Sequence, residues 1–113
     1  MIGFSPPYAP TIYAEMMADG RHTYIPKEVA ALEDLFWRNN FGYFNFSDAA
    51  QLGATGEDMI DAFHASEFIN LRMYIHMLKA LPDTLGPYSD LAFLEPLALH
   101  PPSSRFELFG NRF

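Results

Sequence analysis

The stretch from Gly56 to Leu81 constrains the fold more than any other feature of the chain, because it is the longest apolar segment without a proline. Large apolar side chains cover most of the circumference of a helix drawn through it. A helix over this range would be about 37 Å long, at about 1.5 Å per residue. The sequence therefore predicts one long central helix against which the other elements pack.

The charges of this segment also favour a helix. Thr55 is a suitable N-cap, acidic residues follow it, and bases fall in the last turns, where the helix dipole favours them. Pro82 ends the pattern. One narrow stripe of the helix is expected to face solvent: Asp58, Asp61, Ala65, Ile69, Arg72, His76 and Lys79.

A second, shorter helix is predicted over residues 26–39, where Val29, Leu32 and Phe36 recur at helical spacing and Asn39-Asn40 follow. Three further short helices are expected, at about Thr11–Ala18, at Asp48–Leu52 and from Asp90 to the residue before Pro96.

Phe41–Phe46 is dense in aromatic residues, and its alternation is too short to identify a strand. We interpret it as a linker, because no second strand-like segment is available to pair with it. The predicted fold is therefore all-α: a helical domain over residues 26–96, with extended proline- and aromatic-rich arms at 1–25 and 97–113.

The composition is that of one folded domain, since half of the 113 residues are hydrophobic and 16% are aromatic. The absence of cysteine excludes disulfides, thiolate nucleophiles and cysteine metal sites. The chain begins without the basic residues and apolar run of a secretory signal, and the central segment is too polar to cross a bilayer. We expect a location in the cytoplasm or within a virion.

The formal charge of −7 lies entirely in residues 1–70, which hold ten acids and three bases. Residues 47–63 resemble a helix-turn-helix in their spacing, with a glycine turn at Gly53. No lysine or arginine occurs from Ser47 to Ala62, so phosphate would be repelled. We interpret the stretch as a helical corner, and direct nucleic-acid binding is disfavoured.

Three polar residues, His64, Glu67 and Asn70, are spaced at intervals of three. On one helix face, His64 and Glu67 could reach the same zinc or iron ion, which makes a small metal-binding helical protein one alternative. The competing interpretation is that Glu67 and Asn70 are buried polar groups that fix the packing. The 26–39 helix offers no histidine to complete a site, so no metal or cofactor is assigned.

Catalytic motifs are absent from the sequence. The serines lie in no triad context, and there is no phosphate loop or dinucleotide glycine pattern. We therefore expect a protein that is not an enzyme.

Both ends of the chain carry adjacent prolines and several aromatic rings, which are features of partner-binding segments rather than solvated tails. We predict a structural or adaptor subunit of a larger protein assembly, with a virion component as the leading case. An alternative is an acidic helical protein that regulates or inhibits a nucleic-acid-handling enzyme. The predicted partner-binding residues are Phe4, Pro6, Pro7, Tyr8, Tyr13, Phe106, Phe109 and Phe113.

Overall fold

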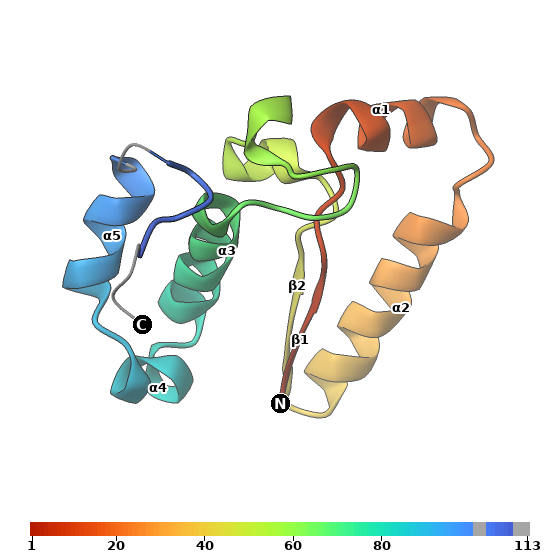
Figure 1. The fold of residues 1–113 in the computed structure, drawn as a ribbon. Coiled ribbons are helices and arrows are strands. Elements are labelled where there is room, and N and C mark those ends of the chain that lie inside the picture. Colours follow the sequence, from red (N-terminus) through yellow and green to blue (C-terminus); the bar gives the residue numbers. More distant parts are fainter. Residues whose placement is uncertain (101–103, 110–113) are drawn as a thin grey trace.

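The fold has three layers, with a small sheet between helices (Figure 1). The structure is a computed structural model, which describes residues 1–100 and 104–109. The sheet consists of β1 (Ile2–Ser5) and β2 (Gly42–Asn45). On one side of it lies α2 (Tyr24–Arg38), and on the other lie α3 (Glu67–Ala80) and α5 (Leu91–Leu99).

The two strands are parallel, and Ile2 lies opposite Gly42. The crossover between them contains α1 (Pro10–Ala18) and α2, so the first part of the chain is a β-α-α-β unit. The prediction of an all-α fold is therefore wrong. Each strand has only four residues, which is too short for alternation to show in the sequence.

The interpretation of Phe41–Phe46 as a linker is also wrong, because Gly42–Asn45 within it form β2. The strand that pairs with β2 belongs to the N-terminal segment, which had been predicted to be an extended arm because of its prolines. The pairing continues past the sheet, since Phe46 N donates to Ser5 O over 3.2 Å and Tyr8 N donates to Ser47 O over 2.9 Å. The beginning of the chain is thus fixed onto its own domain.

The predicted 26–39 helix is confirmed as α2, which begins two residues earlier and ends at Arg38. Asn40 has a φ of 58°, a left-handed conformation that asparagine tolerates better than most residues. Phe41 N then donates back to Phe36 O over 2.9 Å. This C-terminal cap turns the chain directly into β2.

The long helix predicted from Gly56 begins only at Glu67, where the Ser66 hydroxyl accepts a hydrogen bond from Ile69 N. Upstream, the acids bind backbone groups in local turns instead of opening a helix. The Asp58 carboxylate accepts from Thr55 N over 2.7 Å, and Asp61 accepts from Phe63 N and His64 N. Such side-chain bonds compete with helical ones.

Residues 47–63 do not form a helix-turn-helix either, because Asp48 and Asp58 bind backbone groups in local turns. A 3₁₀ turn over Ala49–Leu52, capped by Asp48, leads through left-handed Gly53 to a second 3₁₀ turn over Gly56–Asp58. No α-helix follows until Glu67.

The predicted solvent-facing stripe is also wrong at four positions. Asp58 and Ile69 are buried, and Ala65 and Arg72 are half-buried. The Arg72 guanidinium donates to Leu52 O over 2.7 Å and to Ala98 O, and it lies 4.2 Å from the centre of the Phe68 ring. Because α3 begins late, these residues face neighbouring segments and not solvent.

The end of the chain is not an arm that starts at residue 97. Pro96 lies inside α5, which continues to Leu99. Residues 104–109 then return to α3: Arg105 pairs with buried Asp58, Phe68 N donates to Arg105 O over 3.1 Å, and Leu108 N donates to Glu67 Oε2 over 2.8 Å. Two short turns, α4 (Pro82–Leu85) and a 3₁₀ turn over Gly86–Tyr88, connect α3 to α5.

Candidate functional site

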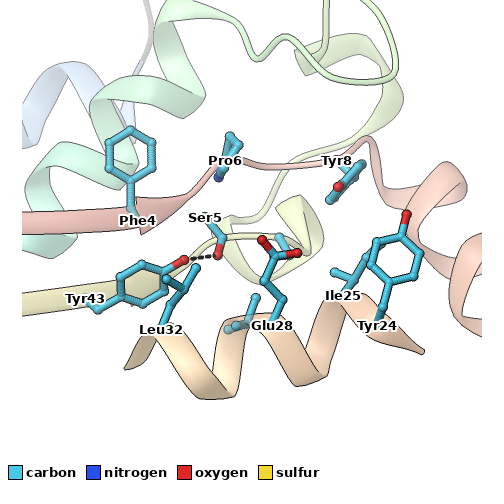
Figure 2. A pocket seen from close by; sticks show the side chains of 11 residues that line it. Phe4, Ser5, Pro6, Tyr8, Tyr24, Ile25, Glu28, Leu32 and Tyr43 are labelled. Carbon is cyan, nitrogen blue, oxygen red and sulfur yellow. Dashed lines mark hydrogen bonds between the residues drawn. The ribbon is translucent and has the colours of Figure 1, made fainter. Parts of the chain in front are cut away.

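A pocket of about 250 Å³ opens between α2 and the segment that follows β1 (Figure 2). Its walls combine aromatic rings, aliphatic side chains, hydroxyls and one carboxylate. The lining residues are Phe4, Ser5, Pro6, Tyr8, Tyr24, Ile25, Glu28, Val29, Leu32, Tyr43 and Ser47.

The pocket forms because α2 approaches the sheet closely at one end only. At Gly3, an added Cβ would lie 2.6 Å from the Phe36 ring, so the C-terminal half of α2 is in tight contact with β1. Toward its N-terminus, α2 diverges from the strands (Figure 1). Ile25, Val29 and Leu32, which share one face of α2, form an apolar wall of the space that remains.

Hydroxyl groups line the deep part of the pocket. Ser5 Oγ and Tyr43 Oη are 2.7 Å apart and form a buried hydrogen bond (Figure 2). Ser47 is only 2% exposed, yet its hydroxyl has no hydrogen-bond partner among residues 1–100 and 104–109. Since no buried side-chain nitrogen or oxygen of the described residues lacks a partner, the Ser47 hydroxyl reaches the open space of the pocket, where a ligand could bond to it.

The carboxylate comes from Glu28. Its side chain extends from α2 toward the segment from Pro6 to Tyr8 (Figure 2). Within the described part of the chain, Glu28 forms no ion pair or hydrogen bond. Tyr24 lies one helical turn before it at the same edge of the pocket.

Aromatic rings continue from the pocket across the adjacent surface. The Tyr8 ring stacks on Tyr13 at 6.1 Å and meets the edge of Phe63 at 5.7 Å. Tyr24 and Phe63 are about half exposed, at 57% and 58%. We call four residues, Tyr8, Tyr13, Tyr24 and Phe63, the aromatic surface. The ring of Phe4 points to the other side of β1, where it contacts Phe46 (Figure 2).

The N-terminal residues predicted to bind partners come together here. Phe4, Pro6 and Tyr8 line the pocket, and Tyr13 stacks on Tyr8. Pro7 is buried. Four further residues at the site were not predicted from the sequence: Tyr24, Glu28, Ser47 and Phe63. Tyr24 lies before the predicted 26–39 helix, so its position one turn before Glu28 follows only from the earlier start of α2.

Of the C-terminal residues predicted to bind partners, Phe106 and Phe109 belong to the segment beside α3 and α5 (Figure 1). Phe106 is 43% exposed, whereas Phe109 packs against the main core and lines a second cavity with Glu67 and Tyr74. Phe113 lies outside the described residues. Phe106 and Phe109 do not line the pocket between α2 and β1.

The hypothetical metal pair is separated by the late start of α3. His64 precedes the helix and is exposed, with its Nδ1 2.7 Å from Asp61 Oδ2, whereas Glu67 accepts from Leu108 N. Hydrogen bonds from Phe63 N and from His64 lower the pKa of Asp61. Throughout residues 1–100 and 104–109, no group of three metal-binding side chains comes together.

Titratable groups elsewhere form local pairs. Asp19 accepts from Arg21 N and lies beside the Arg21 and His22 side chains, and these bonds lower its pKa to about 2, with the backbone bond as the main cause. Asp34 pairs with Arg38. In the described chain, no histidine hydrogen-bonds a serine, so no nucleophile and base are placed together.

Neither a family model nor a curated protein nor a solved structure matches this chain. No helix among the described residues has the length and apolar character needed to span a membrane.

Proposed function

We propose that this protein is a small non-enzymatic subunit that binds another protein through the aromatic surface. The observation that supports this most directly is the continuity of that surface with the pocket. Tyr8 and Tyr24 line the pocket, and Tyr13 and Phe63 extend it through ring contacts with Tyr8. Contiguous exposed aromatic surface of this kind is typical of protein-binding sites.

The aromatic surface is already ordered in the free chain, which reduces the entropy lost on binding. The bond from Tyr8 N to Ser47 O fixes Tyr8 beside the end of β2. Ala9 N donates to Ala62 O over 2.9 Å, which holds the loop that carries Phe63 beside α1. A rigid partner could therefore bind without rearranging the backbone.

Charge favours a partner that differs from this chain. The aromatic surface belongs entirely to residues 1–70, which carry the whole excess of acids over bases. Two copies that met through this surface would repel each other, whereas a basic partner would be attracted. Residence in a virion stays a prediction, as does the alternative of an acidic regulator of a nucleic-acid-handling enzyme.

Site-specific photo-crosslinking tests the proposal. A benzophenone amino acid replaces Phe63 in the cells that naturally produce the chain. A control chain carries it at Tyr88, which is 87% exposed, the most of any aromatic residue that the structure describes, and lies between α4 and α5. We expect a crosslink to one defined protein from position 63 that is absent from position 88. The Tyr8→Ser variant, which removes the ring in contact with Phe63, should weaken that crosslink.

Two results would overturn the proposal. One is an identical set of crosslinked proteins from both positions, which indicates random collisions. The other is a crosslink from position 63 that Tyr8→Ser leaves unchanged while circular dichroism shows a native fold, because the partner then binds outside the aromatic surface.

A further inference from the structure

We propose that the pocket between β1 and α2 receives an arginine side chain of the partner protein. This inference rests on the proposed function, because it specifies how the partner of the aromatic surface is recognised. The juxtaposition that carries it is one carboxylate without an ion pair, one hydroxyl that opens into the cavity without a hydrogen-bond partner, and the rings of Tyr8 and Tyr24, all around a single cavity.

The charge of the pocket calls for a cation. Glu28 is the one residue charged at neutral pH among the described residues that line the pocket. Glu28 is exposed to solvent, and no cation of the described chain lies within ion-pair distance of its carboxylate. Lys27 is its immediate neighbour in sequence, but adjacent residues do not share a helix face. An incoming cation would be the first partner of this carboxylate.

The other lining groups suit a planar cation. The rings of Tyr8 and Tyr24 border the space, and a guanidinium group stacks favourably on aromatic faces. The Ser47 hydroxyl can accept a hydrogen bond, and the Ser5 and Tyr43 hydroxyls retain acceptor lone pairs although they bond to each other. Each of these groups offers what a cationic donor needs.

Arginine fits this combination better than lysine. Its guanidinium presents five donors in a fixed plane, binds carboxylates through two parallel bonds and is less strongly hydrated than an ammonium group. The pocket likewise distributes its acceptors, with the Glu28 carboxylate on α2 and the Ser47 hydroxyl after β2. An anion would be repelled by Glu28, and a neutral group would form a weaker hydrogen bond with the carboxylate than a cationic donor does.

Titration of the isotope-labelled full chain by nuclear magnetic resonance tests this inference without the natural partner. The probe is arginine blocked at both ends, N-acetyl-arginine N-methylamide. Citrulline blocked in the same way is the neutral control of equal shape, and blocked lysine is the second cationic probe. We expect chemical-shift changes for arginine at the amides of Ser5, Tyr24, Glu28 and Ser47, and about tenfold weaker binding for citrulline.

A matched pair of variants separates the pocket from general electrostatic attraction. Glu28→Gln should weaken arginine binding about tenfold, whereas Glu33→Gln, with the same change in net charge on the same helix but outside the pocket, should leave it unchanged. Ser47→Ala should weaken it less, because it removes one neutral acceptor. Lysine should bind more weakly than arginine.

Equal binding of arginine and citrulline, equal effects of the two glutamate variants, or shifts outside the pocket would each overturn the inference. Stronger binding of lysine than of arginine would also overturn it, because the pocket would then prefer an ammonium group to a guanidinium group. Failure here is distinguishable from failure of the proposed function: a selective crosslink at position 63 together with no arginine binding would reject the pocket inference alone. Loss of that selective crosslink would reject the function itself.

Discussion

The two faces of the small sheet differ in chemistry, although they belong to the same two strands. On the α3 side, Phe44 and Phe46 stack on each other at 6.1 Å, and His76 meets both rings edge-on. On the α2 side, the corresponding positions carry Ser5 and Tyr43, whose hydroxyls bond to each other beside a pocket. Alternation along a strand thus separates a packed face from a polar, open one.

The main core follows the same division. Its buried and half-buried members come from the sheet, from α1, α3 and α5 and from the neighbouring turns and loops, and none of them belongs to α2. α2 buries only Ile25 and Val29, and it covers the sheet as a separate layer. We infer that the α3 side provides most of the stability, which leaves the α2 side free to carry a binding site.

The largest expected effect is that of Phe46→Ala on the α3 side. Phe46 is buried in the main core, and its loss should lower the free energy of unfolding by about 3–5 kcal/mol. Leu32→Ala, which removes a half-buried wall of the pocket, should cost less than about 2 kcal/mol. Urea unfolding measures both, and equal losses would contradict the division into a stabilising and a binding side.

The next effect concerns the closure of the α3 side by the end of the chain. Asp58→Ala removes the partner of Arg105 and of Thr55 N, which should cost about 2–3 kcal/mol. Asp61→Ala, whose ion pair with His64 is exposed, should change stability little. If both variants unfold at the same urea concentration, the pair between Asp58 and Arg105 does not hold residues 104–109 on α3.

The same carboxylate should make stability depend on pH. Burial raises the pKa of Asp58, but the hydrogen bonds from Thr55 and Arg105 outweigh it and the pKa is lowered below the usual 3.8. A lowered pKa adds stability above the unfolded value, and this is lost as the pH falls through the folded value. Below about pH 4, the wild type should therefore lose stability more steeply than Asp58→Ala. Parallel acid unfolding curves would contradict this assignment.

Close approach of the layers can be tested at two glycines on opposite faces. A Cβ at Gly3 would meet the rigid Phe36 ring at 2.6 Å, whereas a Cβ at Gly42 would meet the flexible end of Leu81 at 2.8 Å. Gly3→Ala should cost about 1–3 kcal/mol, and Gly42→Ala less, because a terminal methyl group moves more easily than a ring. If Gly42→Ala lowers the stability more than Gly3→Ala in thermal unfolding, α2 moves away from the sheet more easily than the end of α3 does.

The sequence predicted elements better where their signals were local. The spacing of Val29, Leu32 and Phe36, followed by Asn39-Asn40, located α2 correctly, because helix periodicity and capping involve near neighbours. The pairing of Ile2–Ser5 with Gly42–Asn45 was missed, since it joins segments about forty residues apart and neither shows a clear pattern. Similarly, Asp58 and Asp61 have the composition of a helix start, but their bonds to backbone groups form turns.

The candidate site was predictable only in part. Phe4, Pro6, Tyr8 and Tyr13 were selected because proline and aromatic residues gather at the beginning of the chain, and they do lie at or beside the pocket. Their companions come from α2 and from the loop before α3, so that the site exists only after the parallel strands pair. No pattern in the sequence marks Ser47 or Phe63 as neighbours of Tyr8.

The smallest expected effect lies on the α2 side, at the hydrogen bond between Ser5 and Tyr43. Tyr43→Phe leaves the buried Ser5 hydroxyl without its partner and should cost about 0.5–1.5 kcal/mol. Adding Ser5→Ala should recover part of this loss, because no polar group is then left unpaired, and a double-mutant cycle measures the coupling between the two hydroxyls. If the α2 side serves binding more than stability, Tyr43→Phe should weaken arginine binding while leaving unfolding of the α3 core nearly unchanged. A loss as large as that of Phe46→Ala would instead make the two faces equal contributors to the fold.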